Sequence, residues 1–154
     1  MTDRSLIWAQ MDLFITALTI WREASNQPPD AWVGIAHCIL NRAQRPSWWG
    51  RNVIEVCTKR EQFTSMNTAT NDPNLRRWPQ RGDKVFEAIY TTVELTLSGH
   101  SQHPIPGADS YYDESREANP PKWARDNPGR YRGKIGAFYF YDMDQDYEAG
   151  TVPV

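Results

Sequence analysis

The sequence predicts an α+β protein that is mainly helical and has a small extended part near its C-terminus. Three observations predict this fold class. Apolar residues recur at helical spacing through the first hundred residues, clusters of Pro, Gly, Asn and Ser separate these stretches, and aromatic residues dominate a short run near position 140. The length of 154 residues favours a single domain, which we expect to span residues 1–154.

The first helix is expected to end near Ala24, because the prolines and polar residues of 25–29 break a helix. Apolar side chains at three- and four-residue steps are typical of one buried helix face. In this helix they are Ile7, Met11, Phe14, Leu18 and Trp21.

Three further helices are expected. The second follows the prolines at 28–29 and stops before Pro46, and a short third helix covers 53–60. Asp83 is placed to cap the fourth helix and Gly99 to end it. The expected buried face of the fourth helix consists of Val85, Phe86, Ile89, Tyr90, Val93 and Leu97.

The segments outside these helices are expected to be loops and strands. Residues 64–82 have little periodicity and predict a long surface loop. Residues 107–112 are expected to be extended, 113–132 are polar and rich in Pro and Gly, and 134–141 are expected to form one aromatic strand. The acidic tail cannot form an EF-hand loop, because Tyr147 and Pro153 stand where that loop needs Gly and Glu.

Composition narrows the classes of function. Seventeen basic and 19 acidic residues give a net charge of −2, which argues against non-specific nucleic-acid binding, since that needs a basic face. No apolar run is long enough to cross a bilayer, and the N-terminus lacks the basic start and the cleavage site of a signal peptide. We therefore expect the protein to be made in the cytoplasm without a Sec signal. We also expect that it does not insert stably into a membrane. The 19 aromatic residues favour ring stacking on a ligand.

Glu23 is the candidate catalytic acid. It is expected at the C-terminal end of the first helix, where the helix dipole disfavours a negative charge, and it follows Ile20 and Trp21. A carboxyl held near apolar rings loses solvation, which raises its pKa and keeps a proton available for a glycosidic oxygen. The alternative is a solvated glutamate beside Arg22.

Five segments carry a family resemblance, in order along residues 13–141. They are Arg22-Glu23-Ala24 with Pro28 and residues 36–42, Gln62-Phe63-Thr64, Gly107-Ala108 with Tyr111-Tyr112, residues 121–123, and Ile135-Gly136 with residues 138–141. Together they resemble the cell-wall hydrolase family, which includes the spore cortex-lytic enzyme SleB and several phage lysins.

The resemblance implies a lysozyme-like fold that cleaves the MurNAc–GlcNAc β-1,4 bond of peptidoglycan, with Glu23 as the single catalytic carboxyl. Members are regarded as lytic transglycosylases. The acid protonates the glycosidic oxygen and then, as a base, helps the 6-hydroxyl of the same sugar close a 1,6-anhydro ring. The partner is the glycan strand, and no cofactor or metal is implied. A phage-type lysin of this kind would reach the wall through a separate pore protein.

Six further residues are candidates for substrate binding. Gln62 is expected to hydrogen-bond an acetamido group, with Phe63 packed beneath it; a capping or core role for the two is the open alternative. Four tyrosines are expected to line the groove, namely Tyr111, Tyr112, Tyr139 and Tyr141. Because a strand alternates its faces, about half of the rings in 135–141 are expected to be structural. Exposed loop positions are expected for Trp48, Trp49, Trp78 and Trp123.

The sequence departs from the family pattern at two places. Gln27 stands where the family has a second glutamate, which supports Glu23 as the acid. Phe138 stands where the family has a histidine.

Two alternatives stay open. A true muramidase needs a second carboxylate to guide water, for which Glu61, Asp109 and Asp113 are candidates. A non-catalytic peptidoglycan-binding or virion structural module would keep the fold without the chemistry. No metal site is expected, because His37, His100 and His103 are interpreted as ordinary polar residues.

Overall fold

The computed structural model describes residues 3–45, 49–59, 62–68 and 71–143. This part of the chain is mainly helical and has a three-stranded antiparallel sheet near its C-terminal end, which confirms the α+β class. The elements are α1 (Asp3–Ala24), α2 (Pro29–Gln44), α3 (Val53–Thr58), α4 (Lys84–Leu97), β1 (Ser110–Asp113), α5 (Lys122–Arg125), β2 (Tyr131–Ile135) and β3 (Phe138–Tyr141). Short 3-10 helices lie in the loops, among them η1 (Thr64–Met66) and η2 (Pro73–Arg76).

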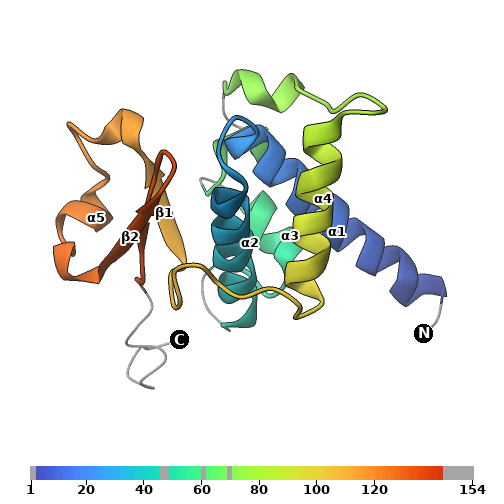
Figure 1. Cartoon of the computed structure of the whole chain (residues 1–154), viewed down its shortest axis with the longest axis horizontal. Helices are drawn as coiled ribbons and strands as arrows, with labels where there is room; N and C mark the ends of the chain where they lie inside the picture. Colours follow the sequence, from blue (N-terminus) through green and yellow to red (C-terminus); the bar gives the residue numbers. More distant parts are fainter. Residues whose placement is uncertain (1–2, 46–48, 60–61, 69–70, 144–154) are drawn as a thin grey trace.

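The core lies where α1, α2, α3 and α4 pack together. α1 contacts each of the other three helices, and α2 contacts both α3 and α4. The core side chains are apolar and fully buried, as expected for faces that meet in the middle of a helical layer, and they include Ile20, Ile35, Ile39, Ile89 and Val93. In Figure 1 α2 is the helix of this layer that lies nearest the sheet, and α5 lies beyond the sheet.

α1 ends at Ala24 as predicted, but its expected buried face was too long. Ile7 is 61% exposed and Met11 is 40% exposed, whereas the helix is continuously buried only from Thr16 to Arg22. The N-terminal end of α1 extends beyond the other helices (Figure 1), which leaves Ile7 and Met11 exposed in the described part of the chain. The spacing of the apolar residues predicted the helix correctly and its packing partners incorrectly.

The expected boundaries of α4 are confirmed. The Asp83 side chain accepts a hydrogen bond from the backbone N–H of Phe86 at 2.9 Å, which caps the first turn. Gly99 has a φ of +82° and ends the helix in the left-handed conformation. Val85 is 40% exposed, so it does not belong to the buried face that the spacing predicted.

The predicted single strand over 134–141 is wrong, because this segment is the turn and second half of a hairpin. Gly136 has a φ of +56°, which reverses the chain between β2 and β3. β3 then pairs with β1 on its other edge, giving the order β1-β3-β2. The Gln27 side chain braces the turn by accepting a hydrogen bond from the backbone N–H of Ala137 at 2.9 Å.

The sheet carries aromatic residues on both faces. Tyr111 packs against the buried rings of Phe138 and Phe140, with ring centres 5.1 Å and 5.8 Å apart. Neighbouring side chains point to the opposite face, where Tyr112 stacks on Tyr139 at 5.0 Å. Figure 1 shows the sheet between α2 and α5, so one aromatic face meets the helical layer and the other meets α5.

The described residues contain no helix that has both the length and the apolar character needed to cross a bilayer. Cys38 and Cys57 are buried free thiols, and burial raises the pKa of Cys57 to about 11. Cys38 packs as a small apolar residue of the core.

α2 and β3 approach each other closely at Gly34. A methyl group added there would lie 3.0 Å from Cζ of Phe140, whose ring is fully buried. A side chain at this position would therefore require the buried Phe140 ring to shift.

We expect Gly34→Ala to destabilise the fold. Overpacking a filled core costs about 1–3 kcal/mol, which outweighs the gain in helix propensity of about 1 kcal/mol. Urea unfolding should show a free energy of unfolding lower by about 1 kcal/mol than that of the wild type. Gly129→Ala is the matched control, because nothing lies within 4 Å of its added methyl group and it should change little. Unchanged or increased stability of Gly34→Ala would contradict this packing.

Candidate functional site

Glu23 lies in a polar cavity at the C-terminal end of α1. The cavity has a volume of about 370 Å³ and is lined by Arg22, Glu23, Ser25, Asn26, Gln27, Asn74, Arg77 and Asp113. We call it the Glu23 cavity. Its wall combines two carboxyl groups, two guanidinium groups and three amides, so it is suited to a ligand rich in hydroxyl, amide or charged groups.

The surroundings of Glu23 favour its protonated form. Burial raises the pKa of its carboxyl, and the negative charges of Asp72 and Asp113 raise it further. The hydroxyls of Ser65 and Tyr111 act in the opposite direction, because they interact favourably with the ionised carboxylate. The net result is a pKa of Glu23 above the ordinary value, while the two hydroxyls still stabilise the ionised form.

Tyr111 connects the sheet to Glu23. Its phenol hydroxyl donates a hydrogen bond to Oε1 of Glu23 at 3.4 Å, across 88 positions of sequence. Burial and the charge of Glu23 hold the pKa of Tyr111 well above its usual range, so the phenol keeps its proton and remains a donor. The backing of Tyr111 by Phe138 and Phe140 fixes the ring in this orientation.

Arg22 holds the opposite wall of the cavity in place. Its guanidinium donates hydrogen bonds to the backbone carbonyls of Ser65, Leu75 and Arg77 at 3.0–3.2 Å. These carbonyls belong to the irregular segment between α3 and α4, which has no long helix or strand to satisfy them. Arg22 itself is only 5% exposed. One buried side chain thus fixes the loop that faces Glu23.

Of the three acids considered as a second carboxylate, Asp113 lies in the Glu23 cavity. Asp109 is fully buried and pairs with Arg45 at 2.6 Å, while it also accepts a hydrogen bond from the backbone N–H of Met143. Asp109 is therefore committed to holding the chain together. Glu61 lies outside the described residues.

A second cavity lies beside Tyr111. It has a volume of about 350 Å³ and is lined by Arg42, Trp49, Gln62, Ser110, Tyr111, Trp123 and Met143. We call it the Gln62 cavity. Tyr111 joins the two cavities, because its side chain lines this one while its hydroxyl contacts Glu23 in the other. The Gln62 cavity has aromatic walls, whereas the Glu23 cavity is charged.

The other predicted binding residues are divided between the core and the far face of the sheet. Phe63 is 3% exposed and packs below the guanidinium of Arg42 at 5.5 Å. The remaining three tyrosines line neither of the two cavities and lie on the face opposite Tyr111, in a ring cluster with Trp123: Tyr112, Tyr139 and Tyr141. A role for these three in binding sugar stays a prediction, and it would require substrate to reach that outer face.

The four tryptophans expected in exposed loops have different environments. Trp78 is 55% exposed, as predicted, and Trp123 is half-buried against the Gln62 cavity. Trp49 is only 2% exposed, so its predicted exposure is wrong; it is part of the core and stacks under Arg42 at 5.3 Å. Trp48 lies outside the described residues.

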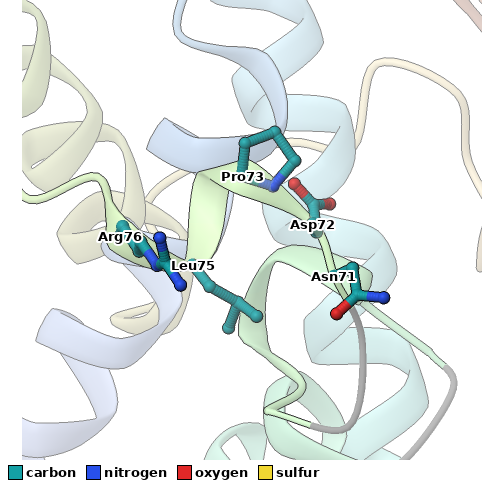
Figure 2. Close-up of a pocket in the computed structure, with 5 residues that line it drawn as sticks. All are labelled: Asn71, Asp72, Pro73, Leu75 and Arg76. Carbon is teal, nitrogen blue, oxygen red and sulfur yellow. The ribbon is translucent and has the colours of Figure 1, made fainter.

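A third cavity, of about 360 Å³, lies along the segment that leads into η2. Figure 2 shows its lining residues, which are Asn71, Asp72, Pro73, Leu75 and Arg76. Asp72 caps η2 by accepting a hydrogen bond from the backbone N–H of Asn74 at 2.8 Å, and it accepts another from the Thr64 hydroxyl at 2.6 Å. This cavity therefore contains no carboxyl in an environment like that of Glu23.

The histidines contribute to packing. His37 and His103 stack with ring centres 4.9 Å apart, and their Nε2 atoms meet the Ser101 hydroxyl and the Ala108 carbonyl. Burial lowers the pKa of His37 to about 4. His100 meets the Ser98 hydroxyl through Nδ1. No group of three or more His, Cys, Asp or Glu within the described ranges could hold a metal ion.

Sequence reasoning did not find several residues that line the Glu23 cavity or act on the pKa of Glu23. Ser65, Asp72 and Arg77 all come from the aperiodic segment predicted only as a surface loop. No spacing rule connects this segment to α1. The one signal was Arg22, since a cation that stands next to a half-buried acid needs partners elsewhere in the chain.

These features define a class of protein before any comparison. A half-buried glutamate of raised pKa, with a second carboxylate in the same cavity, is typical of an enzyme that transfers protons in acid–base catalysis.

Comparison with known families names that class more closely. Residues 26–141 match the family described as Cell Wall Hydrolase, and the chain belongs to this family. Cell wall hydrolases act on peptidoglycan, which supports a peptidoglycan-degrading role for this chain. Neither the curated proteins nor the solved structures that were compared gave a match. The match begins three residues after Glu23, so a role for Glu23 depends on its geometry.

We expect Glu23→Gln to raise stability at neutral pH. The pKa of Glu23 is higher in the folded chain than in the unfolded chain, so ionisation of the buried carboxyl disfavours folding as pH rises through the folded pKa. The unfolding temperature of Glu23→Gln should exceed that of the wild type at pH 7, and the difference should shrink toward pH 4. Glu94→Gln, on the exposed side of α4, is the control and should show no such trend. A variant less stable than the wild type at pH 7 would argue against a desolvated Glu23.

Proposed function

We propose that this protein cleaves the MurNAc–GlcNAc β-1,4 bond of peptidoglycan as a lytic transglycosylase, with Glu23 as the single catalytic acid and base. The observation that carries the proposal is the half-buried Glu23 carboxyl, whose pKa is raised inside a cavity large enough for part of a sugar chain. Membership of the cell wall hydrolase family supports the choice of substrate.

The proposed first step is protonation of the glycosidic oxygen by Glu23. Burial keeps the carboxyl protonated at a pH where an ordinary glutamate is ionised. As the bond breaks, positive charge develops on the sugar ring, and the acetamido oxygen of MurNAc stabilises it. The proton that leaves Glu23 ends on the departing GlcNAc hydroxyl.

In the second step the ionised Glu23 removes the proton from the 6-hydroxyl of MurNAc. The oxygen of this hydroxyl closes the 1,6-anhydro ring, so no water is consumed. The hydroxyl of Tyr111 donates to Oε1 of Glu23 and, together with Ser65, stabilises the carboxylate between the two steps. Glu23 ends the cycle protonated.

The two cavities support a binding mode for the glycan. The Gln62 cavity offers an amide and aromatic rings for the apolar faces and the acetamido group of a sugar. The Glu23 cavity offers charged groups and amides for a polar substituent. We infer that the strand runs past Tyr111, which contacts both cavities, within a fold of the lysozyme-like kind. A phage-type lysin that needs a pore protein is a further prediction of this proposal.

One observation favours a second candidate function, the hydrolytic muramidase. Asp113 lines the same cavity as Glu23 and raises the pKa of Glu23 through its charge. A carboxylate in that position is suited to guide a water molecule toward the sugar. Hydrolysis would yield reducing ends in place of anhydro ends.

Mass spectrometry of digested peptidoglycan tests both candidates. We expect the wild type to release 1,6-anhydro muropeptides, each one water lighter than the hydrolytic product. Glu23→Gln should lower the rate of release by about 10²–10⁴-fold, the usual contribution of a general acid. Asp113→Asn should still form anhydro ends.

Other outcomes have definite meanings. If the wild type releases reducing ends and Asp113→Asn does not, the muramidase replaces the transglycosylase as the proposed function. Binding of the wild type to peptidoglycan without any release of product would leave a non-catalytic binding module. Equal rates for the wild type and Glu23→Gln would remove Glu23 as the acid.

A further inference from the structure

Arg77 lines the Glu23 cavity, and within the described residues the hydrogen-bond partners of its guanidinium group are uncharged. Nη1 donates to the side-chain oxygen of Asn74 at 3.0 Å, and Nη2 contacts the Ser25 hydroxyl at 3.4 Å. Its Cζ atom lies 4.5 Å from the centre of the Trp21 ring, which holds the guanidinium plane against the end of α1. The side chain is exposed, so its remaining N–H groups are accessible from the cavity.

The position of Arg77 is fixed by Arg22. Nε of Arg22 donates to the backbone carbonyl of Arg77 at 3.0 Å. The two guanidinium groups lie close enough for the charge of Arg77 to lower the pKa of Arg22, after the larger effect of burial. None of the ion pairs formed within the described ranges includes either residue. Two guanidinium groups that form no salt bridge within the described residues therefore share one wall, and the negative charge of Asp72 acts on Arg22.

Besides Glu23, the charged side chains that line the cavity are those of Arg22, Arg77 and Asp113. Asp72 is not among the lining residues, but its negative charge acts on both Arg22 and Glu23. The lining thus has two guanidinium groups for one carboxyl group other than Glu23, in a chain whose net charge is −2. A fixed guanidinium with free donors recognises a planar anion such as a carboxylate better than it recognises a neutral sugar hydroxyl.

We propose that Arg77 binds a carboxylate carried by the C3 substituent of a muramoyl residue, and that this contact makes the enzyme prefer anionic peptidoglycan over neutral glycan. The inference rests on the proposed function. The carboxylate has two chemical sources, because a muramoyl residue presents either the free carboxylates of its stem peptide or, once the peptide is removed, its own lactyl carboxylate.

Three forms of one soluble, uncrosslinked peptidoglycan preparation test the proposal. The first is untreated, the second has its carboxylates converted to amides with carbodiimide and ammonia, and the third has its stem peptides removed by an amidase. Initial rates of product release at limiting substrate give an apparent kcat/KM for the wild type, Arg77→Gln and Arg77→Lys. Arg76→Gln is the matched control, since Arg76 is the neighbouring exposed arginine and lines the third cavity, along the segment that leads into η2 (Figure 2).

Wild-type kcat/KM should fall about 10-fold from untreated to amidated substrate, the usual effect of losing one hydrogen bond between charged groups. Arg77→Gln should lose about the same 10-fold on untreated substrate and nothing further on amidated substrate. Arg77→Lys should recover part of the loss, and Arg76→Gln should resemble the wild type. An Arg77 effect that persists on peptide-free strands identifies the lactyl carboxylate, and one confined to untreated substrate identifies the stem peptide.

The contrary results are distinct. Equal loss for Arg77→Gln on untreated and amidated substrate would make Arg77 a structural residue only and overturn the proposal. Equal wild-type rates on those two substrates would overturn it without any variant, so a poorly folded variant cannot obscure the answer. A wild type that cleaves none of the three forms would overturn the proposed function and this inference together.

Discussion

The structure of the site depends on the buried guanidinium of Arg22. In the described part of the segment between α3 and α4, two short 3-10 helices and a few turns pair the backbone, and Arg22 accounts for three further carbonyls. An uncompensated carbonyl in a buried place costs about 1–3 kcal/mol, so this one side chain decides where the segment lies. Glu23, the next residue, then meets Ser65 and Asp72 from that segment. Arg22 thus holds the wall in place, and the adjacent Glu23 places its carboxyl against that wall.

The carboxyl of Glu23 is balanced between two kinds of neighbour. Burial and nearby acids favour the proton, and two hydroxyls stabilise the anion. The proposed cycle needs both protonation states of Glu23 within reach, because an extreme preference for either would stop one half of it. The balance has a cost in stability, since burying an ionisable group weakens folding at neutral pH. Such a position is more easily explained by chemistry than by packing.

Much of the helical part followed from local rules. The cap at Asp83, the stop at Gly99 and the break after Ala24 are written in residue types that have one dominant structural use. Periodicity could not show that Ile7 and Met11 lack a partner, because exposure depends on how far the other helices reach. Exposure is therefore a property of the assembled layer of helices and not of one helix.

The sheet and the site were harder to predict, for two physical reasons. The turn at Gly136 falls inside the run 134–141, so one strand was expected where the structure has the end of β2, a turn and β3. The alternation of a strand then sends Tyr111 to Glu23 and its neighbour Tyr112 to the far face, and sequence alone does not say which face meets the helices. Glu23 was predicted from its place at the end of a helix together with the family resemblance, both of which are visible in the sequence. Arg77 was not, because only tertiary contacts bring it to the cavity.

The central claim is that this fold raises the pKa of the Glu23 carboxyl above its ordinary value, so that the group can act as an acid. A titration of ¹³C-labelled glutamate side chains by NMR measures this directly, with Glu23→Gln to assign the resonance. We predict a pKa above the ordinary value of 4.5, lowered in Asp113→Asn because a neighbouring negative charge is lost, and raised in Tyr111→Phe because a donor to the carboxylate is lost. A wild-type Glu23 that titrates at or below 4.5 would contradict the account.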